Sequence, residues 1–373
     1  MGRELEEERY ITTIGFCEVN GAKWLIDKNN YLYKVEDEKY TPIVNLSCFV
    51  DNRYFQYQDS GMFVYKENLF CLPGCGEFIS VYNTLNGKCL KIELPEVDWI
   101  RCTDPVFWNG RLFIFSTAPG RELIIIDVET LEVSIETDFC EKIKEFEDEN
   151  SYFLTNSVVQ KQDKAYFGAL NTNTIVEFNL ENGKLRKFRE FPKGVHIEYL
   201  FLDNGGDFWV SDKTSGQLIG LKSDNLVTFE LDNSYIKDCV WKGIFVGDMA
   251  IFISRIGNGV VTINLNSKDV VYKRIVVGEM SEKEAEKESF LKNIELINDK
   301  VVIWLGEYGR VETDIDLIEQ KFYKMDKNED ASVLEILRNE KKVQEIYDRP
   351  FANVLYESRN NTMERFLFDV MEG

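Results

Sequence analysis

The sequence predicts an all-β protein built from seven successive units of four antiparallel strands, followed by a short helical extension. Three observations support this prediction. Turn signals rich in Asn, Gly and Asp recur about every 42 to 53 residues along the 373-residue chain. Each turn is followed by a run of β-branched and aromatic residues, which favour strands. Further strand-like runs complete each unit before the next turn, so one period is sustained seven times.

Each unit is expected to contain the same elements in the same order. A first strand leads into a two-residue turn, where Asn, Gly and Asp tolerate a positive φ. The second strand is apolar, as at Trp24-Leu25-Ile26, and a looser connection that often contains Gly leads to the third strand. The fourth strand alternates, as in "KCLKIELPE" from Lys88. The seven turns begin at Asn20, Glu67, Asn109, Gln162, Asn204, Gly247 and Asn298.

Repeats of this length with four strands each are typical of a β-propeller. One such sheet cannot bury both faces alone, but seven sheets packed radially bury one another. The sequence therefore predicts a seven-bladed β-propeller over residues 1–326 and a helical extension over residues 327–373. A β-sandwich is the alternative, although sandwiches do not sustain one period seven times.

The stretch "GGDFWVSDKTSGQLIGL", residues 205–221, resembles a blade of the NHL-type, streptogramin-lyase-like and gluconolactonase-like propellers. The Gly-His and Trp-Asp dipeptides of WD40 blades do not occur in the chain. The resemblance covers roughly residues 10–325 at the level of the single repeat. It implies the seven-bladed propeller superfamily and carries over no activity.

Three segments fall outside the period. Residues 141–150 form an acidic insertion that we expect to be solvated. Residues 281–290 begin with Ser281 and Glu284, a capping box that predicts a short exposed helix. The tail has apolar residues near helical spacing before Pro350, and a second such segment after it. The tail helices are expected to pack on the propeller, or alternatively to dock a partner.

Composition restricts the classes of partner. The net charge of −21 opposes binding to nucleic acid and to anionic membranes. No apolar run approaches the roughly 18 residues that a membrane-spanning helix needs, and "MGRELEEERY" lacks the apolar part of a signal peptide. We therefore expect a cytoplasmic monomer. The eight scattered cysteines are expected to be reduced thiols without a structural disulfide.

The residues that carry chemistry are few. His196 is the single histidine, which excludes His-rich metal sites and a catalytic pair of histidines. It also weakens the lyase activity that the streptogramin-lyase-like resemblance would imply, because that family uses histidines. Cys71 and Cys75 lack the second ligand pair of a zinc site. No phosphate-binding loop or G-x-S-x-G nucleophile motif occurs.

The candidate site is one mouth of the propeller. In this topology, the connections that enter first strands and those that join second to third strands share one face. That face would also gather residues 117–121, 213–216 and 255–258. Concave sites with a few convergent polar groups are the usual binding sites. The candidate ligand-binding residues there are Arg53, Trp99, Arg101, Asp104, His196, Glu198 and Asp238.

The sequence favours a non-catalytic propeller that binds a protein, peptide or small molecule at this mouth without a cofactor. The alternative is a hydrolase or lyase with a divalent ion and carboxylates on the propeller axis. The gluconolactonase-like resemblance implies such an ion. Asp104, Glu198 and Asp238 would then be oxygen ligands, which suit Ca²⁺.

Overall fold

The computed structural model describes the chain in fourteen segments. They are residues 13–27, 31–36, 39–46, 61–72, 78–94, 104–116, 122–146, 157–168, 173–212, 215–222, 225–287, 290–305, 308–324 and 326–327. Within these segments, no helix has both the length and the apolar character needed to cross a membrane. The expected helical extension lies outside the described residues, apart from Lys327 at its start.

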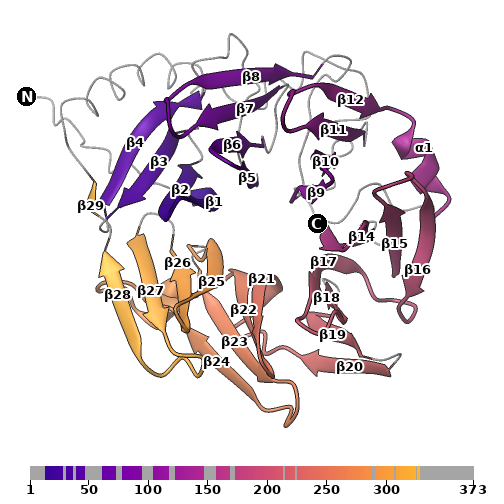
Figure 1. Ribbon diagram of the computed structural model, residues 1–373. Coiled ribbons are helices and arrows are strands. Elements are labelled where there is room, and N and C mark those ends of the chain that lie inside the picture. Colours follow the sequence, from indigo (N-terminus) through magenta and orange to yellow (C-terminus); the bar gives the residue numbers. More distant parts are fainter. Residues whose placement is uncertain are drawn as a thin grey trace, which may run out of the picture.

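The described residues form seven antiparallel sheets arranged as blades around a common axis (Figure 1). Blade 1 holds β1 (Thr13–Val19), β2 (Ala22–Asp27), β3 (Tyr31–Glu36) and β4 (Lys39–Asn45). Blade 2 holds β5 (Met62–Tyr65), β6 (Asn68–Cys71), β7 (Phe78–Asn83) and β8 (Cys89–Glu93). Blade 3 holds β9 (Val106–Trp108), β10 (Arg111–Phe115), β11 (Leu123–Asp127) and β12 (Val133–Glu136).

Blade 4 holds β13 (Val159–Lys161), β14 (Lys164–Gly168), β15 (Thr174–Asn179) and β16 (Leu185–Glu190). Blade 5 holds β17 (Ile197–Leu202), β18 (Phe208–Asp212), β19 (Gln217–Lys222) and β20 (Asn225–Glu230). Blade 6 holds β21 (Lys237–Val246), β22 (Met249–Ile256), β23 (Gly259–Asn264) and β24 (Val270–Arg274). Blade 7 holds β25 (Asn293–Ile297), β26 (Lys300–Trp304), β27 (Gly309–Thr313) and β28 (Gln320–Lys324). The seven-bladed prediction is confirmed.

The core is divided among the interfaces between neighbouring blades. Alternate residues of β10 point to opposite faces: Leu112 and Ile114 pack against blade 2, whereas Phe113 and Phe115 pack against blade 4. Each of the other five interfaces has its own buried apolar cluster. This arrangement follows from the two-residue period of a strand, which gives each blade two apolar faces.

In blades 1, 3 and 7 the turn between the first and second strands has the predicted two successive residues with positive φ, whereas in blades 2, 4 and 6 only the first residue of the turn has a positive φ. Asn109 and Gly110 have φ values of 47° and 77°, and Asn298 and Asp299 have values of 49° and 62°. Two successive positive φ angles are what a type I′ hairpin requires.

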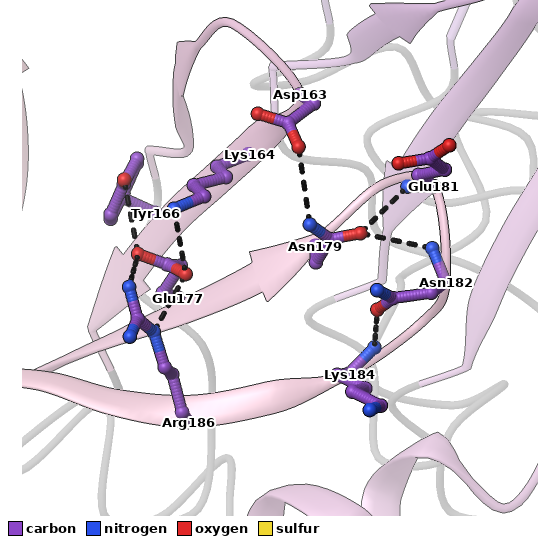
Figure 2. A network of polar contacts seen from close by, with 9 residues as sticks. All are labelled: Asp163, Lys164, Tyr166, Glu177, Asn179, Glu181, Asn182, Lys184 and Arg186. Atoms are coloured by element: carbon purple, nitrogen blue, oxygen red, sulfur yellow. Dashed lines mark hydrogen bonds and ion pairs between the residues drawn. The ribbon is translucent and has the colours of Figure 1, made fainter.

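A second turn, between third and fourth strands, also repeats. In each copy, one Asn or Asp side-chain oxygen accepts hydrogen bonds of 2.9–3.1 Å from the N–H groups two and three residues further on. The backbone one residue after this Asn or Asp donates to the first turn of the same blade. Figure 2 shows the copy at Asn179 in blade 4. The four copies are centred on Asn83, Asp127, Asn179 and Asn264.

The two segments inserted between blades, residues 141–150 and 281–290, differ in how far their helices are buried. The prediction that residues 141–150 are merely solvated is wrong in part, because Ile143 of α1 (Phe139–Lys144) is completely buried in the cluster between blades 3 and 4. Phe139, just before that segment, is buried in the same cluster. The Ser281 capping box is confirmed at α2 (Glu282–Ala285), where only Ala285 is buried.

The ring is closed by strand pairing as well as by side-chain packing between blades 1 and 7. Blade 1 takes its four antiparallel strands from the N-terminal part, and the Leu25, Tyr31, Tyr40 and Trp304 side chains pack in the cluster between blades 1 and 7. The expectation of closure by packing alone is incomplete, however. After β28, a two-residue strand β29 (Asp326–Lys327) pairs in parallel with the outer strand β4.

Candidate functional site

The structure describes four of the seven predicted site residues, and the side chains of only three. Asp104 lies two residues before the start of β9, His196 immediately precedes β17, and Glu198 is the second residue of β17. Asp238 lies in β21, but its side chain is outside the described part. Arg53, Trp99 and Arg101 also lie outside the described residues.

The first strands of blades 5 and 6 carry β-bulges at this end of the propeller. In β17 the register shifts between Ile197 and Tyr199, which places Glu198 in the bulge. In β21 the register shifts between Val240 and Lys242, which places Trp241 in a second bulge. Bulges interrupt the regular alternation of side chains and re-aim them, and they are common next to functional sites. Blades 5 and 6 therefore present side chains here that a regular strand would not.

Asp104 forms an ion pair across the propeller axis. Its Oδ2 lies 3.3 Å from Nζ of Lys242, and the two side chains are 46% and 37% exposed. Asp104 belongs to blade 3 and Lys242 to blade 6, which stand on opposite sides of the ring (Figure 1). The pair thus brings together two blades that share no interface.

Glu198 is held differently. It is 3% exposed, and its Oε1 lies 3.7 Å from Nη1 of Arg255, which is 41% exposed and comes from β22 in blade 6. A buried carboxylate needs a nearby cation to offset its desolvation. The pair therefore places an accessible guanidinium at the junction of blades 5 and 6.

His196 is positioned through its backbone. Its N–H donates to Oδ1 of the buried Asp212 over 2.9 Å, while Ser215 Oγ donates to Oδ2 of the same carboxylate over 2.5 Å. Asp212 ends β18, so this carboxylate ties the entry into blade 5 to the connection between its second and third strands. His196 itself is half-buried.

The connection that follows Arg255 is fixed on several sides. Arg274 donates to the Gly257 carbonyl, and Gly259 N–H donates to Ser254 Oγ over 2.8 Å. Asn258 is 1% exposed; its side chain donates to the Ala285 carbonyl and accepts from Phe290 N–H, both over 2.9 Å. Arg255 therefore stands on a rigid support, which lowers the entropy cost of binding.

Sequence reasoning missed Lys242 and placed Arg255 only among the surrounding residues. The signal for Lys242 was a single lysine inside the apolar run "CVWKGIFV" of a first strand. Next to it, the buried Nε1 of Trp241 has no hydrogen-bond partner among the described residues.

A divalent ion on the propeller axis would need several oxygen ligands directed at one point. Of the three carboxylates considered as ligands, Asp104 faces Lys242 and Glu198 faces Arg255. Within the described residues, no three His, Cys, Asp or Glu side chains are grouped as a metal ion would require. The two described carboxylates are thus each beside a cation.

The architecture defines this chain as a seven-bladed β-propeller with charged side chains near its axis. It is similar to a catalytically inactive virginiamycin B lyase from Staphylococcus aureus solved with quinupristin, at 16% identity and a TM-score of 0.53, covering 74% of this chain and 86% of that one. It is also similar to a streptogramin B lyase, at 12% identity and a TM-score of 0.58, covering 80% and 91% of the two chains.

A third similar structure is the extracellular domain of a hybrid two-component system from B. thetaiotaomicron. Its identity is 14% and its TM-score 0.60, with 85% of this chain and 42% of that chain covered. No protein-family model and no curated protein matches the sequence. At these identities the likeness shows the fold alone, and the streptogramin-lyase-like resemblance is supported at that level.

Proposed function

We propose that this protein is a binding propeller that captures a small molecule or peptide at the mouth lined by Asp104, Lys242, Glu198 and Arg255. The observation that carries the proposal is the pair of ion pairs at this end of the ring. Asp104, Lys242 and Arg255 are 46%, 37% and 41% exposed, and ion pairs made by groups this exposed contribute little to folding. Their position near the axis is better explained by recognition of a ligand.

The enzyme alternative has less support from the side chains. A hydrolase or lyase of the axial-ion type would need several carboxylate oxygens directed at one point. The two described carboxylates face cations instead. Similarity to lyases at 12–16% identity carries no activity to this chain.

A retention experiment tests the proposal. The purified protein would be equilibrated with a small-molecule and peptide fraction of a cell extract, washed, and analysed by mass spectrometry for what remains bound. The variants Arg255→Met and Lys242→Met remove one mouth cation each. Lys66→Met is the matched control, because Lys66 is an exposed lysine in an ion pair with Glu129 on the opposite face.

We expect compounds that the wild type and Lys66→Met retain and that both mouth variants lose, with all four proteins folded by circular dichroism. The same retained compounds in all four proteins, or none in the wild type, would contradict the proposal.

A further inference from the structure

The accessible charges of the two ion pairs at the mouth are not balanced between the two signs. In the pair between blades 5 and 6, the carboxylate of Glu198 is 3% exposed, whereas its partner Arg255 is 41% exposed. In the pair across the axis, Lys242 and Asp104 are exposed to similar extents. In these two pairs a ligand that enters therefore meets two accessible cations and one accessible carboxylate, even though the whole chain carries a net charge of −21.

Asp104 holds Lys242 weakly compared with structural ion pairs of the same protein. Between Asp104 and Lys242 there is one approach of 3.3 Å, and both side chains are partly exposed. Arg186, in contrast, donates two hydrogen bonds of 2.7 and 2.8 Å to a carboxylate, Glu177, that is only 5% exposed (Figure 2). Partly exposed single contacts typically contribute little, so an arriving anion can displace Asp104 at small cost.

From these observations we infer that the mouth takes a ligand bearing an oxyanion, a carboxylate or a phosphate, and that the Asp104 carboxylate occupies Lys242 as an internal competitor until the ligand replaces it. The inference rests on the proposed function and names the chemistry of its ligand. Lys242 and Arg255, both supplied by blade 6, would bind the anion. Lysine and arginine donate charge-assisted hydrogen bonds to such oxygens.

The bulge at Trp241 and the fixed connection after Arg255 support this assignment. The bulge displaces Lys242 from the regular alternation of β21. The hydrogen bonds of Asn258 and Gly259 hold the backbone that follows Arg255 in place. Both cations are therefore positioned before a ligand arrives, which is the condition for binding a small anion despite an acidic overall charge.

Calorimetric titration with three probes tests the inference: succinate, inorganic phosphate, and succinamide as the uncharged counterpart of succinate. The titrations use wild type, Asp104→Asn, Lys242→Met and the control Lys66→Met at low ionic strength, where exposed charges are least screened. Succinate and phosphate distinguish a carboxylate ligand from a phosphate ligand.

We expect at least one anion to bind wild type and Lys66→Met equally. It should bind about threefold to fivefold more tightly to Asp104→Asn, because the competitor has lost its charge. It should bind at least about tenfold more weakly to Lys242→Met, and succinamide should bind none of the proteins.

Three results would overturn the inference: neither anion binds at millimolar concentration, Lys242→Met binds as well as wild type, or Asp104→Asn binds no more tightly. If the retention experiment finds a neutral or cationic ligand that depends on Arg255, the proposed function stands and this inference fails. If the anions bind as expected but no extract compound is retained, the oxyanion site stands and the proposed function fails.

Discussion

At the scale of single residues, Glu177 shows how a carboxylate stabilises this fold. It lies on β15, where Arg186 and Lys164 of the neighbouring strands form ion pairs with it and the Tyr166 hydroxyl donates to it over 3.1 Å (Figure 2). Burial alone would raise the pKa of Glu177, but the hydrogen bonds from Arg186 and Tyr166 outweigh burial and lower that pKa below its ordinary value of 4.5. Burial and the Glu177 charge raise the pKa of Tyr166 to about 12.

Replacing Glu177 should therefore reduce stability in a pH-dependent way. We expect Glu177→Gln to lower the free energy of unfolding by about 1–3 kcal/mol near neutral pH, because charge-assisted hydrogen bonds to a buried group are lost. A lowered folded-state pKa stabilises above the unfolded value and loses that effect as the pH falls through the folded value. Urea unfolding should thus show a constant difference from wild type at pH 6–8, shrinking below about 4.5.

The exposed Glu190 on the next strand, paired with Lys187, supplies the control. Glu190→Gln should change stability little, and an effect as large as that of Glu177→Gln would contradict this account.

Gly259 is a residue whose missing side chain matters. A Cβ at this position would lie 2.0 Å from the Tyr235 carbonyl oxygen, a backbone atom that cannot move aside freely. We expect Gly259→Ala to destabilise by at least about 1–3 kcal/mol, the usual range for overpacking. At Gly61 the nearest atom would be 3.4 Å away, so Gly61→Ala should be nearly neutral. Thermal unfolding of both variants measures the difference, and equal melting temperatures would contradict it.

At the scale of elements, α1 packs between blades 3 and 4. Phe139 contacts the rings of Phe115, Phe167 and Phe178 at centroid distances of 5.7–6.3 Å. These rings come from β10, β14 and β15, so one short helix touches both sheets. The helix therefore fills the interface between blades 3 and 4, where the strands alone would leave a gap.

Removing the Phe139 side chain should destabilise the protein. Phe139→Ala is expected to lower the free energy of unfolding by about 3–5 kcal/mol, through lost burial and the cavity left behind. The exposed neighbour Glu145 gives the matched control, since Glu145→Ala should have little effect. The measurement is chemical denaturation. Equal stability of the two variants would mean that the helix does not support the interface.

The turns could be predicted from the sequence because their chemistry is local. Asn109 and Gly110 accept a positive φ wherever the chain places them. The burial of α1 also has a signal in the sequence, because Phe139, Ile143 and Phe146 follow helical spacing even though acidic residues lie between them. The parallel pairing of β29 with β4 was not predictable, since two residues carry no pattern.

At the scale of the whole molecule, one part of the candidate site could be predicted from the sequence and another part could not. The face that gathers the connections into first strands follows from topology, so Asp104, His196 and Glu198 could be grouped before their positions were known. The partner of Asp104 could not be predicted, because Lys242 is 138 residues away in the sequence and reaches Asp104 only across the closed ring. Contacts of this kind depend on ring diameter and bulge placement, which local patterns do not encode.

The cysteines give a prediction for the whole chain. Among the described residues, Cys17, Cys71, Cys89 and Cys239 form no disulfide. Burial raises the pKa of the Cys17 thiol to about 12 and that of Cys71 well above its ordinary value. Thiolates are the reactive form, so these two should resist modification in the native protein at pH 8.

Titration of unreduced protein after denaturation should find about eight thiols, the full number in the sequence. Native titration should find fewer, with Cys17 and Cys71 protected on peptide mapping. Four or fewer thiols after denaturation would contradict the expected absence of disulfides.

The division of the core into seven separate clusters also bears on how such a chain can change over evolutionary time. A substitution on one blade face is felt by the facing blade and hardly at all by blades further round the ring. Compensating substitutions should therefore accumulate in pairs across each interface between neighbouring blades. The sequence at one interface can then diverge independently of the other six. Ancestral likeness between blades would then survive only where backbone geometry demands it, in the Asn, Asp and Gly of the turns.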